Sequence, residues 1–289
     1  MKTQIDCFPC FFKQATLASR MAGGDEKLQK KALIETAGLL YTAPLDRDPP
    51  YIATGIFHKV NEIMGTTDPY RKVKDDYNKI VAEKYTDLIN IIKKDTDPLR
   101  AAVKLALAGN IIDFGILEQF DLDAVIEQTM STVPAIDEYQ AMKQMIERAQ
   151  TLLFITDNAG EIGFDRLLID EIHQINKEIR ITVAVKKIPI INDATIYDAQ
   201  FFGIDVKNKL IDNGSNHIGT YLPSCSSEMI EAFTHADMII SKGQANWESL
   251  EENAPDKMWF LLKAKCRCVA EFLKVKLGDI LIVRGRHAR

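Results

Sequence analysis

Hydrophobic residues change their spacing near the middle of the chain. In residues 1–147 apolar side chains recur at every third or fourth position, as in the stretch Asp75 to Lys94, and this spacing is typical of amphipathic helices. Turn signals separate the helical stretches at Pro44 to Pro50, Asp68-Pro69 and Asp97-Pro98. The first half of the chain is therefore predicted to be a helical region of about six helices.

Residues 148–289 follow a different pattern, in which short apolar runs alternate with helical stretches. Apolar runs without polar alternation suit parallel strands that are covered on both faces. Strands are predicted at Leu152–Ile155, Ile181–Val185, Leu210–Ile211, Met238–Ile240, Trp259–Leu262 and Ile280–Val283, and helices at 160–176, 194–202, 225–235 and 247–252. This alternation predicts a doubly wound, mainly parallel α/β sheet.

Polar residues directly follow four successive predicted strands. In such sheets ligands bind beyond the carboxyl ends of the strands. Carboxylate and amide oxygens suit Mg²⁺ or Mn²⁺, while a lysine or a helix N-terminus suits a phosphate-like anion. The candidate residues are Asp157, Asn158, Gly160 and Glu161 after the first strand, Asp193 after the second, and Lys242 and Asn246 after the fourth.

Each of these residues also has an ordinary structural explanation. Asp157 and Asp193 precede predicted helices, so each can equally be a helix cap. Lys242 taken alone is more often a surface lysine than a ligand. The joint appearance of these residues at successive strand ends favours a site for a divalent cation and a phosphoryl group over these separate explanations.

Three common nucleotide or phosphate sites do not match the sequence. The turn after the first strand reads Asp157-Asn158-Ala159-Gly160, which differs from the G-x-G-x-x-G of a dinucleotide-binding domain. No G-x-x-x-x-G-K-[ST] segment is present, and the Asp-x-Asp of a haloacid-dehalogenase-like phosphatase lacks its second Asp. The pattern therefore favours attack by a metal-bound water over a covalent phospho-enzyme.

Composition and charge narrow the class of protein. The 289 residues carry a formal net charge of −5, which offers no basic surface for nucleic acid. No apolar run approaches the roughly 18 residues that a membrane span requires, and Cys7, Pro9 and Lys13 interrupt any signal-peptide pattern. We expect a cytoplasmic protein that acts on a small phosphorylated metabolite and binds neither nucleic acid nor membrane. The oligomeric state is not predicted.

Four of the five cysteines form two close pairs, Cys7-x-x-Cys10 and Cys266-x-Cys268. Four thiols can bind a structural Zn²⁺ or a cluster, although this combination of spacings is irregular for zinc. A redox-sensitive pair and simple buried thiols are the alternatives. A structural metal at Cys7 and Cys10 is therefore one of three open interpretations.

Several longer segments resemble the signature segments of the damage-control phosphatases, a metal-dependent family. In the second half these are "DNAGEIGFDRLL", "IPIINDATIYDA" and "SKGQANWESL". In the first half "DCFPCFFKQA", "DPYRKVKDDYN" and "LAGNIIDFG" are similar to its cysteine-bearing subgroup of archaea and bacteria. The likeness covers nearly the whole chain. It implies a helical N-terminal region, residues 1–147, packed on a Rossmann-like domain, residues 148–289, that carries the metal site.

The resemblance also implies roles for individual residues. Asp157, Asn158 and Asp193 match the family's metal ligands, with Mn²⁺, Ni²⁺, Co²⁺ or Mg²⁺ as candidate ions, and Lys242 matches the lysine that faces the phosphate. Asn110 and Asp113 match a segment that reaches the same site, although a buried capping amide would also explain Asn110.

These observations together predict a metal-dependent phosphatase that hydrolyses phosphate monoesters of sugars or of damaged metabolites. In this interpretation Asp157, Asp193 and Lys242 are catalytic, while Asn110, Gly160, Glu161 and Asn246 join Lys242 in binding the substrate. The alternative is a metal-dependent phosphosugar-binding or sensor protein without turnover, because binding and hydrolysis use the same groups.

Overall fold

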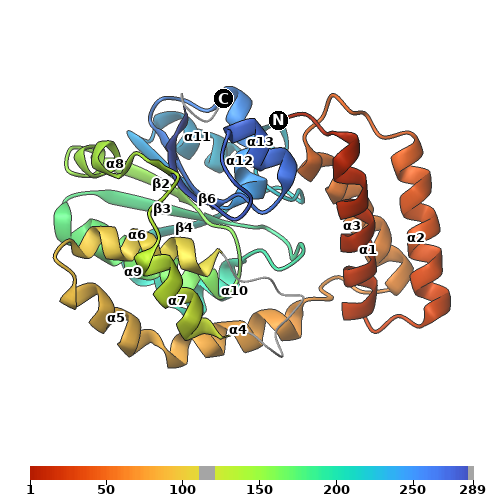
Figure 1. Ribbon diagram of the computed structural model, residues 1–289, viewed down its shortest axis with the longest axis horizontal. Coiled ribbons are helices and arrows are strands. Elements are labelled where there is room, and N and C mark those ends of the chain that lie inside the picture. The colour runs from red at the N-terminus through yellow and green to blue at the C-terminus, as the bar shows by residue number, and fades with distance from the viewer. Residues whose placement is uncertain (111–120, 286–289) are drawn as a thin grey trace.

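The structure, a computed structural model, describes residues 1–110 and 121–285 of the chain. Within these residues the strands form a seven-stranded sheet in the order β1-β7-β6-β5-β2-β3-β4 (Figure 1). Its strands are β1 (Ile136–Asp137), β2 (Thr151–Ile155), β3 (Arg180–Val185), β4 (Lys209–Asp212), β5 (Met238–Lys242), β6 (Met258–Lys263) and β7 (Ile280–Arg284). The six strands predicted from the sequence are confirmed. The two-residue β1 was not predicted because so short a strand has no hydrophobic period.

The sheet is doubly wound, as predicted. All neighbouring strands pair in parallel except β6 and β7, which are antiparallel. From β2 the chain moves outward through β3 and β4 and then returns to β5 on the other side of β2. The carboxyl ends of β2 and β5 therefore lie side by side where the direction of winding reverses, which is the usual ligand-binding position in such sheets.

Helices cover both faces of the sheet (Figure 1). One face is covered by α4 (Arg71–Glu83), α5 (Tyr85–Lys94), α6 (Pro98–Gly109), α7 (Leu122–Ser131), α8 (Tyr139–Ile146), α9 (Glu161–Ile175) and α10 (Ile196–Phe201). The other face carries α11 (Ser227–His235), α12 (Gln244–Leu250) and α13 (Arg267–Leu273). Helices α1 (Phe8–Met21), α2 (Glu26–Tyr41) and α3 (Pro49–Met64) form a bundle beside the sheet, and α3 packs against α12. None of these described helices is long and apolar enough to cross a bilayer.

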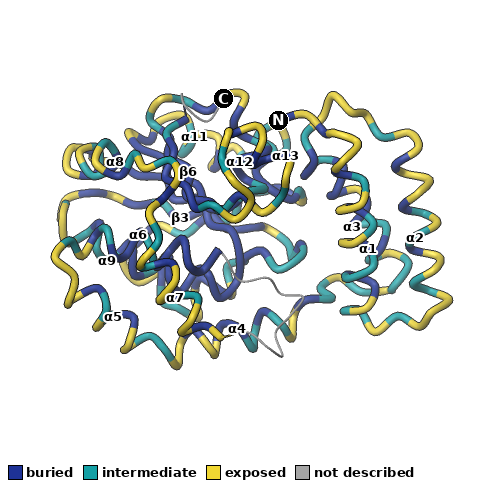
Figure 2. Tube along the Cα trace, viewed as in Figure 1, coloured by how far each residue is buried: buried dark blue, intermediate teal, exposed yellow. Residues whose placement is uncertain are grey.

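Alternate side chains of each central strand enter two different cores. In β2, Leu152 and Phe154 belong to the core under α9, while Leu153 and Ile155 belong to the core under α12. This follows from the two-residue period of a strand. It explains why the sequence of a central strand is continuously apolar. Figure 2 shows the same result, since the central strands β2, β5 and β6 are almost wholly buried while α2 exposes much of its surface.

The predicted boundary between residues 147 and 148 does not separate these two cores. The first-half strand β1 pairs with β7, and the first-half helices α4 to α7 share a core with α9. Helix α6 is the clearest case, because its side chains are buried nearly all round and it packs closely against α9. Its last residue is followed by Asn110, which is therefore delivered to the end of β2.

Candidate active site

Two short segments bring the predicted metal ligands together. The segment after β2 pairs with the turn before α10 through an isolated bridge between Asn158 and Asp193. Ala194 N donates to Asp157 O at 2.8 Å, and Ala159 N donates to Asn192 O at 2.9 Å. Although Asp157 and Asp193 follow different strands, this pairing places them on neighbouring stretches of backbone.

Asp157 is a buried carboxylate without an ion-pair partner among the described residues. Its Oδ2 accepts hydrogen bonds from Asn110 Nδ2 at 2.7 Å and from Asn158 Nδ2 at 2.9 Å. Burial, followed by the charges of Glu161 and Asp193, raises the pKa of Asp157 to about 8. The site therefore holds more negative charge around Asp157 than its own cations balance.

Gly243 allows the Asp157 carboxylate to occupy this position. It follows β5 with a φ of 81°, in the left-handed region that favours glycine. A Cβ atom at Gly243 would lie only 1.9 Å from Asp157 Oδ2. The glycine after β5 is thus required by the neighbouring strand end.

We expect Gly243→Ala to displace the Asp157 carboxylate and weaken metal binding. Thermal melts with and without Mn²⁺ check this, because ligand-induced stabilisation depends on the ratio of ligand concentration to Kd. Gly38→Ala is the control, since a Cβ at Gly38 meets nothing within 4 Å. A Gly243→Ala variant with the parent's Mn²⁺ shift would show that Asp157 does not need this geometry.

Lys242 lies at the centre of a buried charge cluster. Its Nζ donates to Glu161 Oε1 at 2.7 Å, to Asp165 Oδ1 at 2.5 Å and to Ala106 O at 2.9 Å. Burial alone would lower the pKa of this ammonium, but the two carboxylates raise it. The three N–H groups of Lys242 are all used, so Lys242 is not the surface lysine that the sequence alone allowed.

Asp165 lies on α9, one helical turn after Glu161. The structure buries Asp165 beside Lys242, and Arg166 pairs with Asp170. Burial raises the pKa of Asp165 to about 7, and Lys242 opposes this increase.

The N-terminus of α9 was expected to offer free N–H groups to an anion, and this expectation is wrong for its first turn. Gly160 N donates to Asn78 Oδ1 at 2.7 Å, and Glu161 N donates to Ala159 O at 2.8 Å. Ile162 N donates to Asn158 O at 3.1 Å. The first donor is used because α4 packs over the turn and supplies Asn78, and the other two bond to backbone carbonyls of the turn itself.

Two of the residues assigned to substrate binding mainly connect parts of the site. Asn110 donates to both Asp157 and Glu161. Asn246 donates to Thr156 O at 2.9 Å and accepts from Thr220 at 2.7 Å, so it joins the end of β2 to the segment after β4. Their contact with substrate stays a prediction. Asp113 lies outside the described residues.

Lys186 and Asn78, to which the sequence pattern assigned no role, are brought to the site by the structure. Lys186 Nζ lies 3.5 Å from Asp193 Oδ2. Asn78 lies in the "DPYRKVKDDYN" segment and joins Gly160 to Asp198, to which it donates at 2.8 Å. The resemblance of that segment was the available signal for Asn78, and for Lys186 the available signal was its position directly after the predicted strand Ile181–Val185.

The donor set fits a divalent cation. Asp157, Asn158 and Asp193 supply oxygen atoms, which are the ligands that Mg²⁺ and Mn²⁺ prefer. The buried Oδ1 of Asn110, beside Asp157, has no hydrogen-bond partner in the described part of the chain. Uncompensated carboxylates and an unsatisfied buried oxygen are both relieved by a cation.

The two cysteine pairs meet where α1 begins next to α13. Cys7 hydrogen-bonds with Cys268, and both are buried. Burial raises the pKa of all four thiols, that of Cys268 to about 11. Raised values disfavour the thiolate that oxidation and metal binding require. In the described residues no three His, Cys, Asp or Glu side chains surround a common point, and a structural metal at Cys7 and Cys10 stays a prediction.

The buried carboxyl of Glu248, beside these cysteines, is expected to make the stability of the fold depend on pH. Burial raises its pKa to about 8 from the ordinary 4.5, against a hydrogen bond from Gln244. Because the folded pKa is raised, stability present at low pH is lost as pH rises from 4.5 to about 8. We expect the melting temperature of Glu248→Gln to exceed that of the parent by a margin that grows as the pH rises from 4 to 9, as measured in thermal melts. The exposed Glu252→Gln is the control, and parallel curves for parent and Glu248→Gln would contradict the expectation.

Fold and site together define a doubly wound α/β protein with a carboxylate-rich site at its switch point. The model of the damage-control phosphatase ARMT1-like domain matches residues 3–281, and the chain belongs to this family. The chain is 36% identical over 288 residues to damage-control phosphatase PH1575 of Pyrococcus horikoshii, with 99% of each chain covered. It is 30% identical over 287 residues to a damage-control phosphatase of Archaeoglobus fulgidus, and this match covers 97% of this chain and 98% of the relative.

The fold is also that of a solved relative. The crystal structure of a DUF89 family protein from Pyrococcus horikoshii superposes with a TM-score of 0.90 at 35% identity, covering 99% of both chains. The sheet and helix arrangement described above is therefore shared with that protein.

Proposed function

We propose that the chain is a divalent-metal-dependent phosphatase acting on phosphate monoesters of sugars or damaged phosphometabolites. The observation that carries the proposal is the Asp157 carboxylate, which is buried, has no ion-pair partner within residues 1–110 and 121–285, and faces Glu161 and Asp193. The relatives of this chain that are named damage-control phosphatases support phosphate hydrolysis as the class of reaction.

The chain's own residues divide the work of the proposed reaction. Asp157, Asn158 and Asp193 would hold the ion, which when bound supplies a Lewis acid for a phosphoryl oxygen and lowers the pKa of a water. Asn110 holds Asp157 in orientation through its 2.7 Å hydrogen bond. Glu161 is held by Lys242 and Asn158, so its carboxylate has a fixed direction at the edge of the site.

Lys242 has a different role here from the one expected of a phosphate ligand. It balances Glu161 and Asp165, and its positive charge also acts on Asp157, whose pKa it lowers against the effect of burial. A preorganised charge in a site that excludes water stabilises developing negative charge without moving. We therefore assign to Lys242 an electrostatic part in the reaction from its buried position.

Phosphate release from a panel of substrates tests the proposal. The protein is stripped with EDTA and given Mn²⁺, Ni²⁺, Co²⁺ or Mg²⁺ separately, with sugar phosphates and p-nitrophenyl phosphate as substrates. We expect phosphate release only with metal. Substrate-induced thermal stabilisation without phosphate release under any metal would instead support the sensor alternative. An Asp157→Asn variant purified in parallel controls for contaminating phosphatases.

A further inference from the structure

Lys186 lies directly after β3 and is almost fully buried, with 4% of its surface exposed. Its backbone N donates to Ala194 O at 2.9 Å, and it forms an isolated bridge with Thr195. These contacts fix Lys186 alongside the turn that carries Asp193. The backbone of Lys186 therefore lies next to the candidate metal site, and its side chain extends from there.

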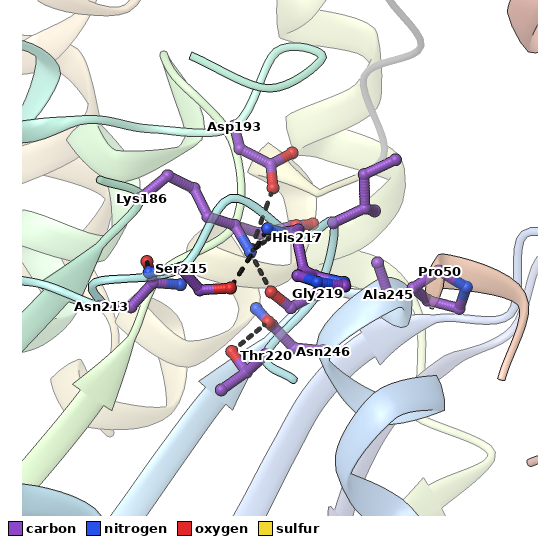
Figure 3. Close-up of polar contacts among 12 residues, drawn as sticks. Pro50, Lys186, Asp193, Asn213, Ser215, His217, Gly219, Thr220, Ala245 and Asn246 are labelled. Atoms are coloured by element: carbon purple, nitrogen blue, oxygen red, sulfur yellow. Dashed lines mark hydrogen bonds and ion pairs between the residues drawn. The ribbon is translucent and has the colours of Figure 1, made fainter. Parts of the chain in front are cut away.

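The ammonium of Lys186 is held mainly by carbonyl oxygens. Nζ donates to His217 O at 3.1 Å and makes a closer contact with Gly219 O, whereas Asp193 Oδ2 is 3.5 Å away (Figure 3). A residue serving only as a charge partner for Asp193 would make its shortest contact there. A buried ammonium must be solvated by the protein, and here two peptide carbonyls do this.

Those carbonyls belong to residues 213–221, the first part of the segment between β4 and α11, which we call the 213–221 loop. Other elements hold the opposite side of this loop. Thr54 of α3 accepts from Ile218 N at 2.9 Å, and Ser249 of α12 accepts from Thr220 N at 2.9 Å. The loop is thus attached to a helix of the first half of the chain, to a helix of the second half, and through Lys186 to Asp193.

The conformation at Gly219 is adapted to this attachment. Its φ is 67°, and a Cβ there would lie 2.5 Å from Ala245 O. The chain therefore passes tightly over α12 while its carbonyl oxygen faces the ammonium of Lys186. Because the backbone at Gly219 contacts α12 on one side and Lys186 on the other, it is held in one position relative to the site.

We propose that Lys186 is a positioning residue that holds the 213–221 loop against Asp193. Its two carbonyl contacts keep the loop and the candidate metal ligand in a constant relative geometry. The inference rests on the proposed function in taking Asp193 as a metal ligand. Lys242 differs, because its charge is balanced by two carboxylates inside the site.

The consequence for catalysis is a matter of geometry. Displacement of bound groups by about 1 Å can reduce the rate of an enzyme about a hundredfold. A loop released from Lys186 no longer presents its groups at a constant distance from Asp193. Metal binding depends on Asp157, Asn158 and Asp193 themselves and is expected to survive that release.

The test compares Lys186→Met, which keeps a long apolar side chain but removes the ammonium, with Lys187→Met at the exposed neighbouring position. Amide hydrogen exchange in the metal-free proteins reports the loop directly. We expect Lys186→Met to exchange about tenfold faster at Ile218 and Thr220, with β2 and β5 unchanged, as expected for local opening. Lys187→Met should match the parent.

Activity and metal binding give the second readout. For Lys186→Met we expect kcat to fall about a hundredfold while calorimetric titration shows Mn²⁺ affinity within about threefold of the parent, because all three ligands remain. Lys186→Arg, which retains charge and donors, should recover slow loop exchange and part of kcat. This recovery distinguishes positioning from a general contribution to stability.

Two results would overturn the proposal. One is unchanged exchange of the 213–221 loop in Lys186→Met, and the other is faster exchange spread evenly over β2, β3 and β5. If the parent releases no phosphate with any metal, the proposed function fails, but the exchange comparison in the metal-free proteins still decides the role of Lys186. The two failures are therefore distinguishable.

Discussion

Asp157→Asn is expected to eliminate metal-dependent phosphate release almost completely and to lower kcat/KM by about two to three orders of magnitude. The substitution keeps the size of the side chain and an oxygen that can accept from Asn110 and Asn158. It removes the negative charge that a divalent ion needs. The stabilisation by Mn²⁺, about 2.7 kcal/mol at a concentration of 100 Kd for the parent, should shrink accordingly.

The same variant should be more stable than the parent when metal is absent. Because the folded pKa of Asp157 is raised from 3.8 to about 8, the parent loses stability as pH rises through this range. Asp157→Asn avoids that loss, so its melting temperature in EDTA should exceed the parent's at pH 8 and match it near pH 4. Asp205→Asn, at an exposed position, is the control. Equal Mn²⁺ shifts in parent and Asp157→Asn would show that Asp157 does not bind the metal; a helix cap is not the explanation, since α9 has Gly160 as its N-cap.

Lys242→Met is expected to destabilise the fold strongly as well as reduce activity. The substitution leaves Glu161 and Asp165 buried without their counter-ion. Breaking a buried ion pair from one side costs about 3–5 kcal/mol, which corresponds to a melting temperature lower by roughly 10 °C in a chain of this size. Thermal or urea unfolding measures the change.

A second substitution identifies the cause of this destabilisation. Adding Asp165→Asn to Lys242→Met removes one of the two uncompensated charges and should restore part of the lost stability. Lys276→Met, at an exposed position, should melt with the parent. If Lys242→Met were as stable as the parent, the buried cluster would not have the charge state described here, and Lys242 would be free to contact a phosphoryl group directly.

The predictable part of the fold is the part with a local hydrophobic period. Continuous apolar runs located β2, β3, β5, β6 and β7, because a strand inside the sheet must be apolar on both faces, while the edge strand β4 was found from a run of two apolar residues. The antiparallel direction of β7 could not be predicted, because pairing direction depends on where the chain returns and not on the composition of the strand. It was equally impossible to predict that α4 to α7 share a core with α9, because the apolar face of an amphipathic helix shows that the helix packs but not which element it packs against.

The site shows the same division. The residue types after β2, β3 and β5 indicated oxygen ligands and a cation, and the structure places them together at the switch point. Whether Lys242 was exposed or buried was not readable from the sequence. That depends on Asp165, one turn along α9, and on Ala106 of α6, which only packing brings to the same ammonium.

The sequence by itself determined which residues carry charge and hydrogen-bonding capacity at each strand end, and the family to which the chain belongs. Those properties are local, since they depend on residue type and on spacing along the chain. The tertiary structure alone decided which donors meet which acceptors. Asn78 reaches Gly160 and Lys186 reaches Gly219 across 82 and 33 residues of sequence, respectively. Contacts at such separations are made by the packing of whole helices against the sheet, and no local pattern encodes them.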